Sequence, residues 1–385
     1  MTEAAPRAST VESVDRRIDA LDVLRGAAIL GTLGTNIWIF TDPAGPLAFL
    51  SFGGDPGVVE AFLRFLSNGK FLGLLTLLFG VGLELQYRSA ARRGVPWPGR
   101  YLWRAALLLV EGTLHFVLVF EFDVLMGYAI TSMIVAYLIG RSDRVVTAWM
   151  AVAGTLLVTM VGLVTLALLA APPGGAGAVA YPRSWLDQVR LRLDNLLVFR
   201  AELIFIVPLG IVLFLLGARL LRAGVFDERG ARLRGRLMAV GLGVGVPLNL
   251  LTSFAGPAWF MVDRYLMAPL VALGLLALVT SIVLAMKGEP GVLRRGLTDV
   301  GRTALSCYVF QNLAAGLLCY GWGLGLATRF DELRPWWVPV AWGGICLMFM
   351  VASSLWLRRF GRGPLELAWQ WAYQAPFRTR AAAGR

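Results

Sequence analysis

About ten apolar segments alternate along the chain with short polar connections. A helix needs about 20 apolar residues to cross a bilayer, and each of these segments is close to that length. The predicted spans cover residues 22–41, 69–88, 101–121, 123–140, 145–172, 201–221, 236–256, 265–286, 303–325 and 337–357. This pattern predicts an all-α polytopic membrane helix bundle of about ten transmembrane helices, forming a single integral membrane domain over residues 1–385.

Polar stretches flank and connect these spans. Residues 1–20 and 358–385 are predicted N- and C-terminal tails, and only Glu121-Phe122-Asp123 separates the third and fourth spans, which predicts a tight helical hairpin. The connection over residues 173–200 carries Trp185, Val189, Leu193 and Leu196 at helical spacing. This spacing indicates an amphipathic helix in an outer loop. The helix either lies on the membrane surface or covers an outward-facing cavity as a lid, and both interpretations stay open.

Composition and charge agree with a membrane location. Hydrophobic residues make up 57% of the chain and charged residues 16%, against about 25% charged residues in soluble domains. The net charge of +12 does not indicate nucleic-acid binding, because the basic residues are spread over the connections. They gather at 88–100, 141–144, 219–236 and 287–302 and in both tails. The positive-inside rule makes that side cytoplasmic and places both termini inside. The abundance of arginine over lysine is typical of GC-rich bacteria, so we expect a multi-pass protein of the bacterial cytoplasmic (inner) membrane.

One pair of ionisable residues stands inside a predicted span. Glu111 and His115, the only histidine, are four residues apart and share a helix face. A charge at this depth costs about 2.5–3.5 kcal/mol, so such groups usually face the protein interior. Counting from Tyr101, His115 lies about 20 Å into a core of about 30 Å, with Asp123 just beyond. A histidine can act as general base, and Glu111 can orient its ring.

These three residues also have structural interpretations. His115 can simply form a hydrogen bond with a neighbouring helix, and Glu111 can hold His115 or close a helix contact. Asp123 precedes the fourth span, where it can cap the helix N-terminus instead of taking part in catalysis. The sequence leaves both interpretations open for each residue.

A second set of candidates lies near the predicted cytoplasmic boundary. Asp22 and Arg25 are three residues apart in the first span and can form an ion pair. Arg25 and Arg104 can bind the phosphates of a substrate headgroup. The alternatives are a structural ion pair for Asp22 and Arg25, and a side chain that reaches for the membrane surface for Arg104.

Further polar candidates stand alone in apolar spans. Gln311 and Asn312 are adjacent, so their side chains point about 100° apart on a helix; we expect one to bond a neighbouring helix and the other to face a cavity. Asn36 is a lone polar residue of the first span. Three cysteines occur without metal-ligand spacing, and no other metal-ligand pattern is present, so we expect no metal site and no bound cofactor.

Several motifs resemble those of a known membrane family. They are RRIDALDVLRGAAILGTLGTNI at the first span, FLGLLTLLFGVGLELQYRSAARRG, YLWRAALLLVEGTLHFVLVFEFDVLMGYAI, GRTALSCYVFQNLAAGLLCYGWGLGL and RRFGRGPLELAWQWAYQ. In this order they resemble domain-of-unknown-function family 418, the YeiB-like integral membrane proteins. The chain departs from the family pattern at Glu111, where an apolar residue is expected, at Cys307, where asparagine is usual, and at Gln370, where arginine is usual.

The resemblance also implies a functional class. The family's opening motif and helical plan are similar to those of transmembrane acyltransferases, including the heparan-glucosaminide N-acetyltransferase-like group. We therefore expect a membrane acyltransferase that moves an acyl group, with acetyl as the leading candidate, from a cytoplasmic-side CoA donor to an envelope or small-molecule acceptor. His115 would be the general base, and acyl-CoA a co-substrate.

Two other classes remain in competition with this hypothesis. A proton-coupled transporter or exporter of a small molecule would use Glu84, Glu111, His115 and Asp123 as a proton relay. A non-catalytic membrane partner or sensor would use its buried charges only for structure. Besides the lipid bilayer, the sequence indicates no macromolecular partner, and it leaves the oligomeric state open.

Overall fold

The computed structural model describes residues 7–46, 57–171 and 181–382, and within these ranges it contains helices and turns but no strand. The first half contains α1 (Arg7–Phe40), α3 (Gly57–Phe65), α4 (Lys70–Arg92), α5 (Arg100–Leu118), α6 (Leu125–Leu138), α7 (Asp143–Ala170), α8 (Trp185–Asp194) and α9 (Leu196–Arg200). The second half contains α10 (Leu203–Arg222), α11 (Ala231–Met238), α12 (Val246–Phe254), α13 (Phe260–Val262), α14 (Ala268–Ala285), α15 (Val292–Arg302), α16 (Ala304–Cys319), α17 (Leu326–Arg329), α18 (Trp337–Leu357) and α19 (Pro364–Ala382).

Most of the predicted spans reappear as long apolar helices. In the described part of the chain, eight segments are long and apolar enough to cross a membrane. The other two predicted spans fall on shorter apolar helices, Leu125–Leu138 and Ala304–Cys319. The chain is thus an all-helical, multi-pass membrane protein, whereas the count of ten spans and the orientation of the termini stay predictions.

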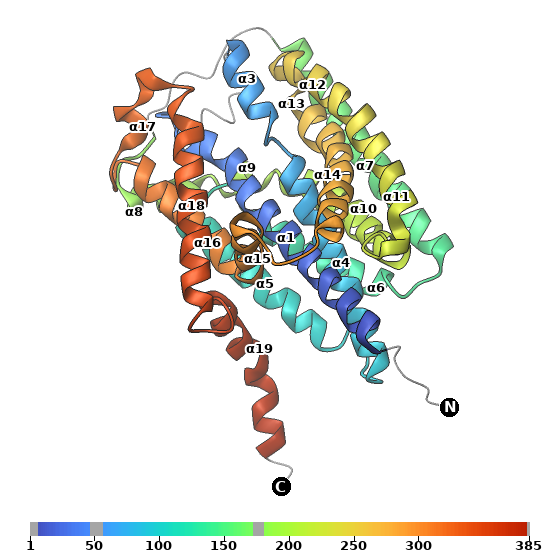
Figure 1. Cartoon of the computed structure of the whole chain (residues 1–385). Coiled ribbons are helices and arrows are strands. Elements are labelled where there is room, and N and C mark those ends of the chain that lie inside the picture. The colour runs from blue at the N-terminus through green and yellow to red at the C-terminus, as the bar shows by residue number, and fades with distance from the viewer. Residues whose placement is uncertain (1–6, 47–56, 172–180, 383–385) are drawn as a thin grey trace, which may run out of the picture.

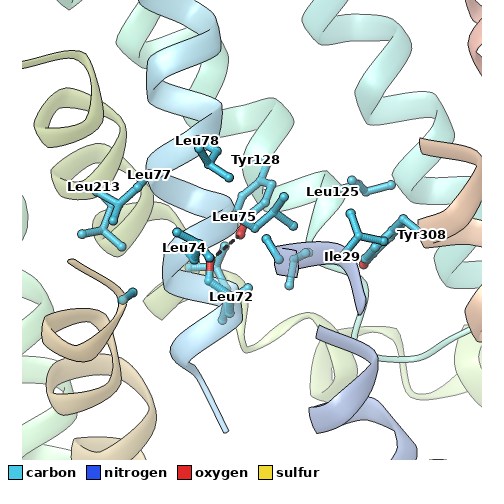
Figure 2. Close-up of a cluster of buried hydrophobic side chains, with 14 of the residues drawn as sticks. Ile29, Leu72, Leu74, Leu75, Leu77, Leu78, Leu125, Tyr128, Leu213 and Tyr308 are labelled. Carbon is cyan, nitrogen blue, oxygen red and sulfur yellow. Dashed lines mark hydrogen bonds between the residues drawn. The ribbon is translucent and has the colours of Figure 1, made fainter. Parts of the chain in front are cut away.

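The helices form one bundle around α1 and α4 (Figure 1). α1 packs on α15, α16 and α14, and α4 packs on α10 and α14. Leucines of α4 meet Tyr128 of α6 in the core, as Figure 2 shows. The Tyr128 hydroxyl lies 2.6 Å from Thr76 Oγ1 and donates to the Leu72 carbonyl at 3.3 Å, so its polar group has partners inside an apolar region.

Close helix crossings explain several glycines. A Cβ atom on Gly301 would lie 1.9 Å from the Asp22 carbonyl oxygen, and one on Gly26 would lie 2.0 Å from the Leu297 carbonyl oxygen. α1 and α15 therefore cross with their backbones in contact, which only glycine permits. This crossing holds the start of α16, and with it the polar residues of that helix, against α1.

We predict that Gly301→Ala lowers the stability of the bundle by about 1–3 kcal/mol, because the added methyl group overpacks the α1–α15 crossing. The midpoint of thermal unfolding in detergent measures the effect. Gly343→Ala is the matched control, since no atom lies within 4 Å of a Cβ built at Gly343. An unchanged midpoint for Gly301→Ala would contradict the prediction.

Both predicted tails contribute helix, which the sequence did not indicate. α1 begins at Arg7, inside predicted tail 1–20, and α19 lies inside predicted tail 358–385. α19 is held against α5, since the Trp103 indole donates to the Ala372 carbonyl at 3.4 Å and the Arg104 guanidinium lies 4.6 Å from the Trp369 ring centre. α19 contains too few apolar residues to be recognised as a membrane span. Its position is therefore known only from its contacts with the bundle.

The predicted hairpin is confirmed. α5 ends at Leu118 and α6 begins at Leu125, and the two helices pack on each other. The turn between them contains Glu121 and Asp123, both buried. Two carboxylates are therefore enclosed at one end of the hairpin, beside His115.

Candidate functional site

His115 forms a buried pair with Asp123. The distance from His115 Nδ1 to Asp123 Oδ1 is 2.9 Å, and the two side chains are 1% and 0% exposed. The other ring nitrogen, Nε2, lies 3.3 Å from Asn312 Nδ2. Because a carboxylate only accepts and an amide nitrogen only donates, this network assigns the proton of a neutral ring to Nδ1 and the lone pair to Nε2. An imidazole oriented in this way by a carboxylate has the form of a general base.

Asp123 is held by the protein from two further directions. Its Oδ2 accepts the Met126 backbone N–H at 3.2 Å, and its Oδ1 accepts the Tyr308 hydroxyl at 3.2 Å. The two interpretations of Asp123 are therefore compatible, since one carboxylate caps the start of α6 and binds His115. Tyr308, whose ring centre lies 5.1 Å from that of His115, was not a candidate from the sequence.

Asn312 connects the site to the first span. Asn36 Nδ2 donates to Asn312 Oδ1 at 3.2 Å, whereas the neighbouring Gln311 donates to the Ile29 carbonyl at 3.1 Å. Gln311 thus bonds a neighbouring helix, as one of the two was expected to do. Asn312 also bonds neighbouring helices, and neither residue lines the cavity described below, so the expectation that one of them faces a cavity is not met. We call Asn36, His115, Asp123, Tyr308 and Asn312 the His115 cluster.

Glu111 does not take the place that its spacing suggested. The structure gives it no hydrogen bond to His115, and Asp123 occupies that position instead. The shared helix face that the spacing predicts therefore does not bring the two side chains into a hydrogen bond. We expected Glu111 to orient the His115 ring, but in the structure Asp123 does so.

Two arginines of the outer-loop helices hold the α5–α6 turn. Arg192 of α8 is 1% exposed, and its Nε donates to Glu121 Oε1 at 2.8 Å. The same guanidinium donates to the Val117 and Val119 carbonyls at 3.0 and 3.3 Å. These carbonyls belong to the C-terminal end of α5, where no helical N–H is available to them, and the helix dipole favours a cation there.

Arg200 completes this support from α9. It donates to the Asp123 carbonyl at 3.1 Å and also to the Glu121 carbonyl, and it lies 4.0 Å from the Phe116 ring centre. The Tyr181 hydroxyl donates to the Glu121 carboxylate, and burial together with that carboxylate raises the pKa of Tyr181 above its usual value. The backbone that carries Asp123 is thus fixed by charge-assisted hydrogen bonds.

The helix predicted within residues 173–200 is present, but it is divided into α8 and α9. Gln188 and Arg192 on α8 are buried, whereas Trp185, Leu186 and Leu193 are exposed. Gln188 and Arg192 therefore face the protein, whereas the exposed positions carry both apolar and charged side chains, including Asp187 and Arg190. The surface-helix and lid interpretations both stay predictions, and α8 packs on α5.

A cavity of about 780 Å³ approaches the His115 cluster from the other end of α5. Tyr101, Arg104, Leu108 and Glu111 follow one face of α5 along it, a rise of about 15 Å from first to last. Tyr308 also lines the cavity, although His115 does not. The cavity therefore ends one side chain away from the Asp123–His115 pair. Figure 2 shows Ile29, Leu75, Leu78, Leu125 and Tyr308, which form its apolar part.

Four arginines line the same cavity: Arg25, Arg104, Arg302 and Arg362. The predicted pair of Arg25 and Asp22 is present at 2.7 Å, and Arg104 stacks on Trp369. Two candidates chosen for phosphate binding thus meet in one cavity. Its wall includes α19, whose Glu366 accepts the Leu305 N–H at 2.8 Å and so caps the start of α16.

Glu84 lies outside this arrangement. Its carboxylate accepts hydrogen bonds from Arg88 Nε at 2.7 Å and from Arg222 Nη2 at 2.7 Å. The structure therefore links His115 and Asp123 directly but does not connect Glu84 to them. Across the described ranges no group of three or more His, Cys, Asp or Glu side chains is placed to hold a metal ion.

A second buried polar cluster surrounds Asp263, and sequence reasoning missed it. The carboxylate accepts from Asn249 at 2.6 Å, from Ser253 at 2.6 Å, from Thr252 at 3.1 Å and from Asn68 at 2.7 Å. With four donors the charge is well satisfied, which is typical of a structural polar network between helices.

Comparisons with known proteins agree with the motifs. A family model described as "Protein of unknown function (DUF418)" matches residues 220–375. The "Uncharacterized protein YxaH" of Bacillus subtilis (strain 168) is 26% identical, covering 92% of this chain and 94% of its own. The "Uncharacterized protein YeiB" of Escherichia coli (strain K12) is 29% identical, covering 91% of this chain and 94% of its own.

A shorter match involves the "Uncharacterized 39.9 kDa protein in amylase 3'region" of Bacillus acidopullulyticus, 33% identical over 27% of this chain and 29% of that protein. No solved structure matches. The family model covers α11 to α18 and most of α19, and the two long relatives extend the likeness to the helices that carry His115 and Asp123. Over residues 220–375 the chain is thus similar to the DUF418 family model, and over most of its length it is similar to two uncharacterized bacterial proteins.

Proposed function

We propose that the protein is an acyltransferase of the bacterial cytoplasmic membrane, which moves an acyl group, with acetyl as the leading candidate, from a CoA thioester to an envelope or small-molecule acceptor. The observation that carries the proposal is the 2.9 Å contact between His115 Nδ1 and Asp123 Oδ1, one helical turn beyond an arginine-lined cavity. The acceptor would reach the pair from the side opposite the donor.

The chemistry of acyl transfer fits these groups. The acceptor O–H or N–H would replace the Asn312 amide at His115 Nε2 and give its proton to that nitrogen. The new bond forms at the acyl carbon, the carbon–sulfur bond breaks, and His115 returns the proton to the departing thiolate. Asp123 stabilises the transient imidazolium, and the amide N–H groups of Asn312 and Asn36 can donate to the developing oxyanion.

The donor would occupy the cavity with its phosphates among the arginines. Arg25, Arg104, Arg302 and Arg362 supply charge-assisted donors, and the face of α5 from Tyr101 to Glu111 offers a path for an extended arm. In the proposed orientation this mouth opens to the cytoplasm, where CoA thioesters occur. Tyr308 separates the far end of the arm from Asp123.

Donor binding is tested by thermal unfolding of the detergent-purified chain with acetyl-CoA, longer acyl-CoA thioesters and free CoA. A ligand at 100 times its dissociation constant stabilises the folded state by about 2.7 kcal/mol, so we expect a clear rise of the midpoint. Arg25→Ala should reduce this rise. The control is Arg295→Ala, because Arg295 is exposed, pairs with Glu289 and does not line the cavity. Absence of a shift with every thioester would contradict the proposal.

One observation favours the competing proposal of a proton-coupled transporter. Both carboxylate oxygens of Glu111 are buried, and no side chain or backbone group in the described ranges forms a hydrogen bond with them. A carboxyl group of this kind can bind and release a proton. A transporter would carry protons across proteoliposome membranes with its substrate and would show no stabilisation by CoA thioesters.

A further inference from the structure

Glu111 has hydrogen-bonding capacity that the protein itself does not use. An ionised carboxylate can accept about four hydrogen bonds, and buried polar atoms nearly always have at least one partner. Both oxygens of Glu111 are enclosed, yet neither has a partner among the described residues. A carboxylate placed in this way among apolar side chains is costly unless something else donates to it.

The cationic groups nearest in the cavity have other contacts. Arg104 precedes Glu111 by seven residues on α5, about 10 Å along the helix, and stacks on Trp369. Arg25 pairs with Asp22, and Arg362 donates to Gln370 at 2.7 Å. Asp123, the other carboxylate at this depth, is engaged with His115 and Tyr308. The protein therefore offers Glu111 no donor, but the residue does line the cavity.

The positions of these charges along the cavity define a ligand. Positive charge collects around Arg25, Arg104, Arg302 and Arg362, and the unpaired carboxylate of Glu111 lies about 10 Å further along α5 from Arg104. Leu108 lies between Arg104 and Glu111 on α5, and Leu75 and Leu78 of α4 add apolar surface to the same cavity. An occupant that satisfies all three regions has an anionic end, a slender middle and an N–H donor.

We infer that Glu111 is a specificity-determining residue that accepts a hydrogen bond from an amide N–H in the pantetheine arm of a CoA-type ligand. The inference rests on the proposed function and adds to it the group that distinguishes a pantetheine thioester from an anionic lipid. A CoA thioester carries two secondary amides between its phosphates and its sulfur. An anionic lipid with plain hydrocarbon chains has phosphate but no such N–H group. Glu111 therefore selects for the arm, whereas the arginines select only for anionic charge.

The test measures the affinity of the full-length detergent-purified protein for CoA and for two CoA analogues, in each of which one pantetheine amide nitrogen is replaced by an ester oxygen. We expect the wild type to bind one of the two analogues about tenfold to a hundredfold more weakly than CoA, because a hydrogen bond to a charged acceptor is lost. Glu111→Leu should bind CoA and that analogue with the same, weakened affinity.

Two further variants keep the comparison interpretable. Glu111→Gln retains an acceptor oxygen and should keep part of the preference for CoA, and Glu289→Gln, at an exposed site outside the cavity, should keep all of it. The preference is the ratio of the affinity for CoA to the affinity for the analogue, measured for one variant. A smaller fraction of folded protein affects both measurements equally and leaves this ratio unchanged. Equal binding of CoA and both analogues by the wild type, or an unchanged preference in Glu111→Leu, would overturn the inference while CoA binding itself still supports the proposed function. Failure of the wild type to bind CoA would overturn both.

Discussion

Arg192→Met is expected to destabilise the protein by about 3–5 kcal/mol, since it removes one partner of a fully buried ion pair. Glu121 would keep its hydrogen bond from the Tyr181 hydroxyl but would lose the positive charge of Arg192. The Val117 and Val119 carbonyls would lose the hydrogen bonds that Arg192 donates to them. Thermal or denaturant unfolding in detergent measures the loss. The matched control is Arg190→Met on the same helix, because Arg190 is 66% exposed and its pair with Asp187 should contribute little.

A double variant separates the ion pair from a general packing defect. Combining Arg192→Met with Glu121→Leu removes both charges, and replacing a buried pair by apolar side chains is often close to neutral. We therefore expect the double variant to recover a large part of the stability lost in Arg192→Met, apart from the share that belongs to the two orphaned carbonyls and to the Tyr181 hydroxyl, which loses its acceptor. A loss in Arg192→Met no larger than in Arg190→Met would show that the buried pair does not hold the α5–α6 turn.

His115→Gln is expected to lower the rate of acyl transfer by about 10²–10⁴-fold, which is the usual contribution of a positioned general base. The glutamine amide can still donate to Asp123, so the hairpin should stay folded. The assay follows release of free CoA from acetyl-CoA by protein reconstituted with a membrane extract as the source of acceptors. Because His115 does not line the cavity, the affinity for CoA should remain unchanged while the rate falls.

Thr113→Ala is the control for this experiment, since Thr113 is exposed on the same helix and only donates to the Leu109 carbonyl. Asp123→Asn should also lower the rate, because an amide at this position no longer stabilises an imidazolium. Full transfer activity in His115→Gln would show that His115 is not the base, even if CoA still binds.

The helical plan of this protein could be read from the sequence to a large extent. The apolar segments coincide with helices because a membrane helix must satisfy its own backbone hydrogen bonds within one continuous stretch. The α5–α6 hairpin follows directly from the three residues between two spans. Gly241 lies in the predicted span 236–256, where a small residue allows close helix approach, and a Cβ atom there would lie 2.4 Å from the Gly274 backbone nitrogen. α19 could not be predicted, because its helix depends on contacts with α5 and α16.

The site was predictable only in part. His115 stood out because it is the only histidine, and Asp123 because it is the last residue of the hairpin connection. Tyr308 was not a candidate from the sequence, yet it is 3% exposed and bonded to Asp123. Arg192 and Arg200 lie in a polar connection, where arginines are common and usually exposed, so nothing in the sequence distinguished them.

The sequence by itself determined which segments are helical, that the chain belongs in a membrane, and that ionisable chemistry is concentrated near His115. These properties depend on local hydrophobicity and on the spacing of residues within one helix. Only the tertiary structure decided that Asp123 rather than Glu111 orients the imidazole, that Asn312 reaches it from α16 and is itself bonded by Asn36 of α1, and that Arg192 and Arg200 hold the turn. Contacts of this kind depend on how helices far apart in the sequence pack, because burial in the bundle forces each charge to find a partner wherever the fold brings one within reach.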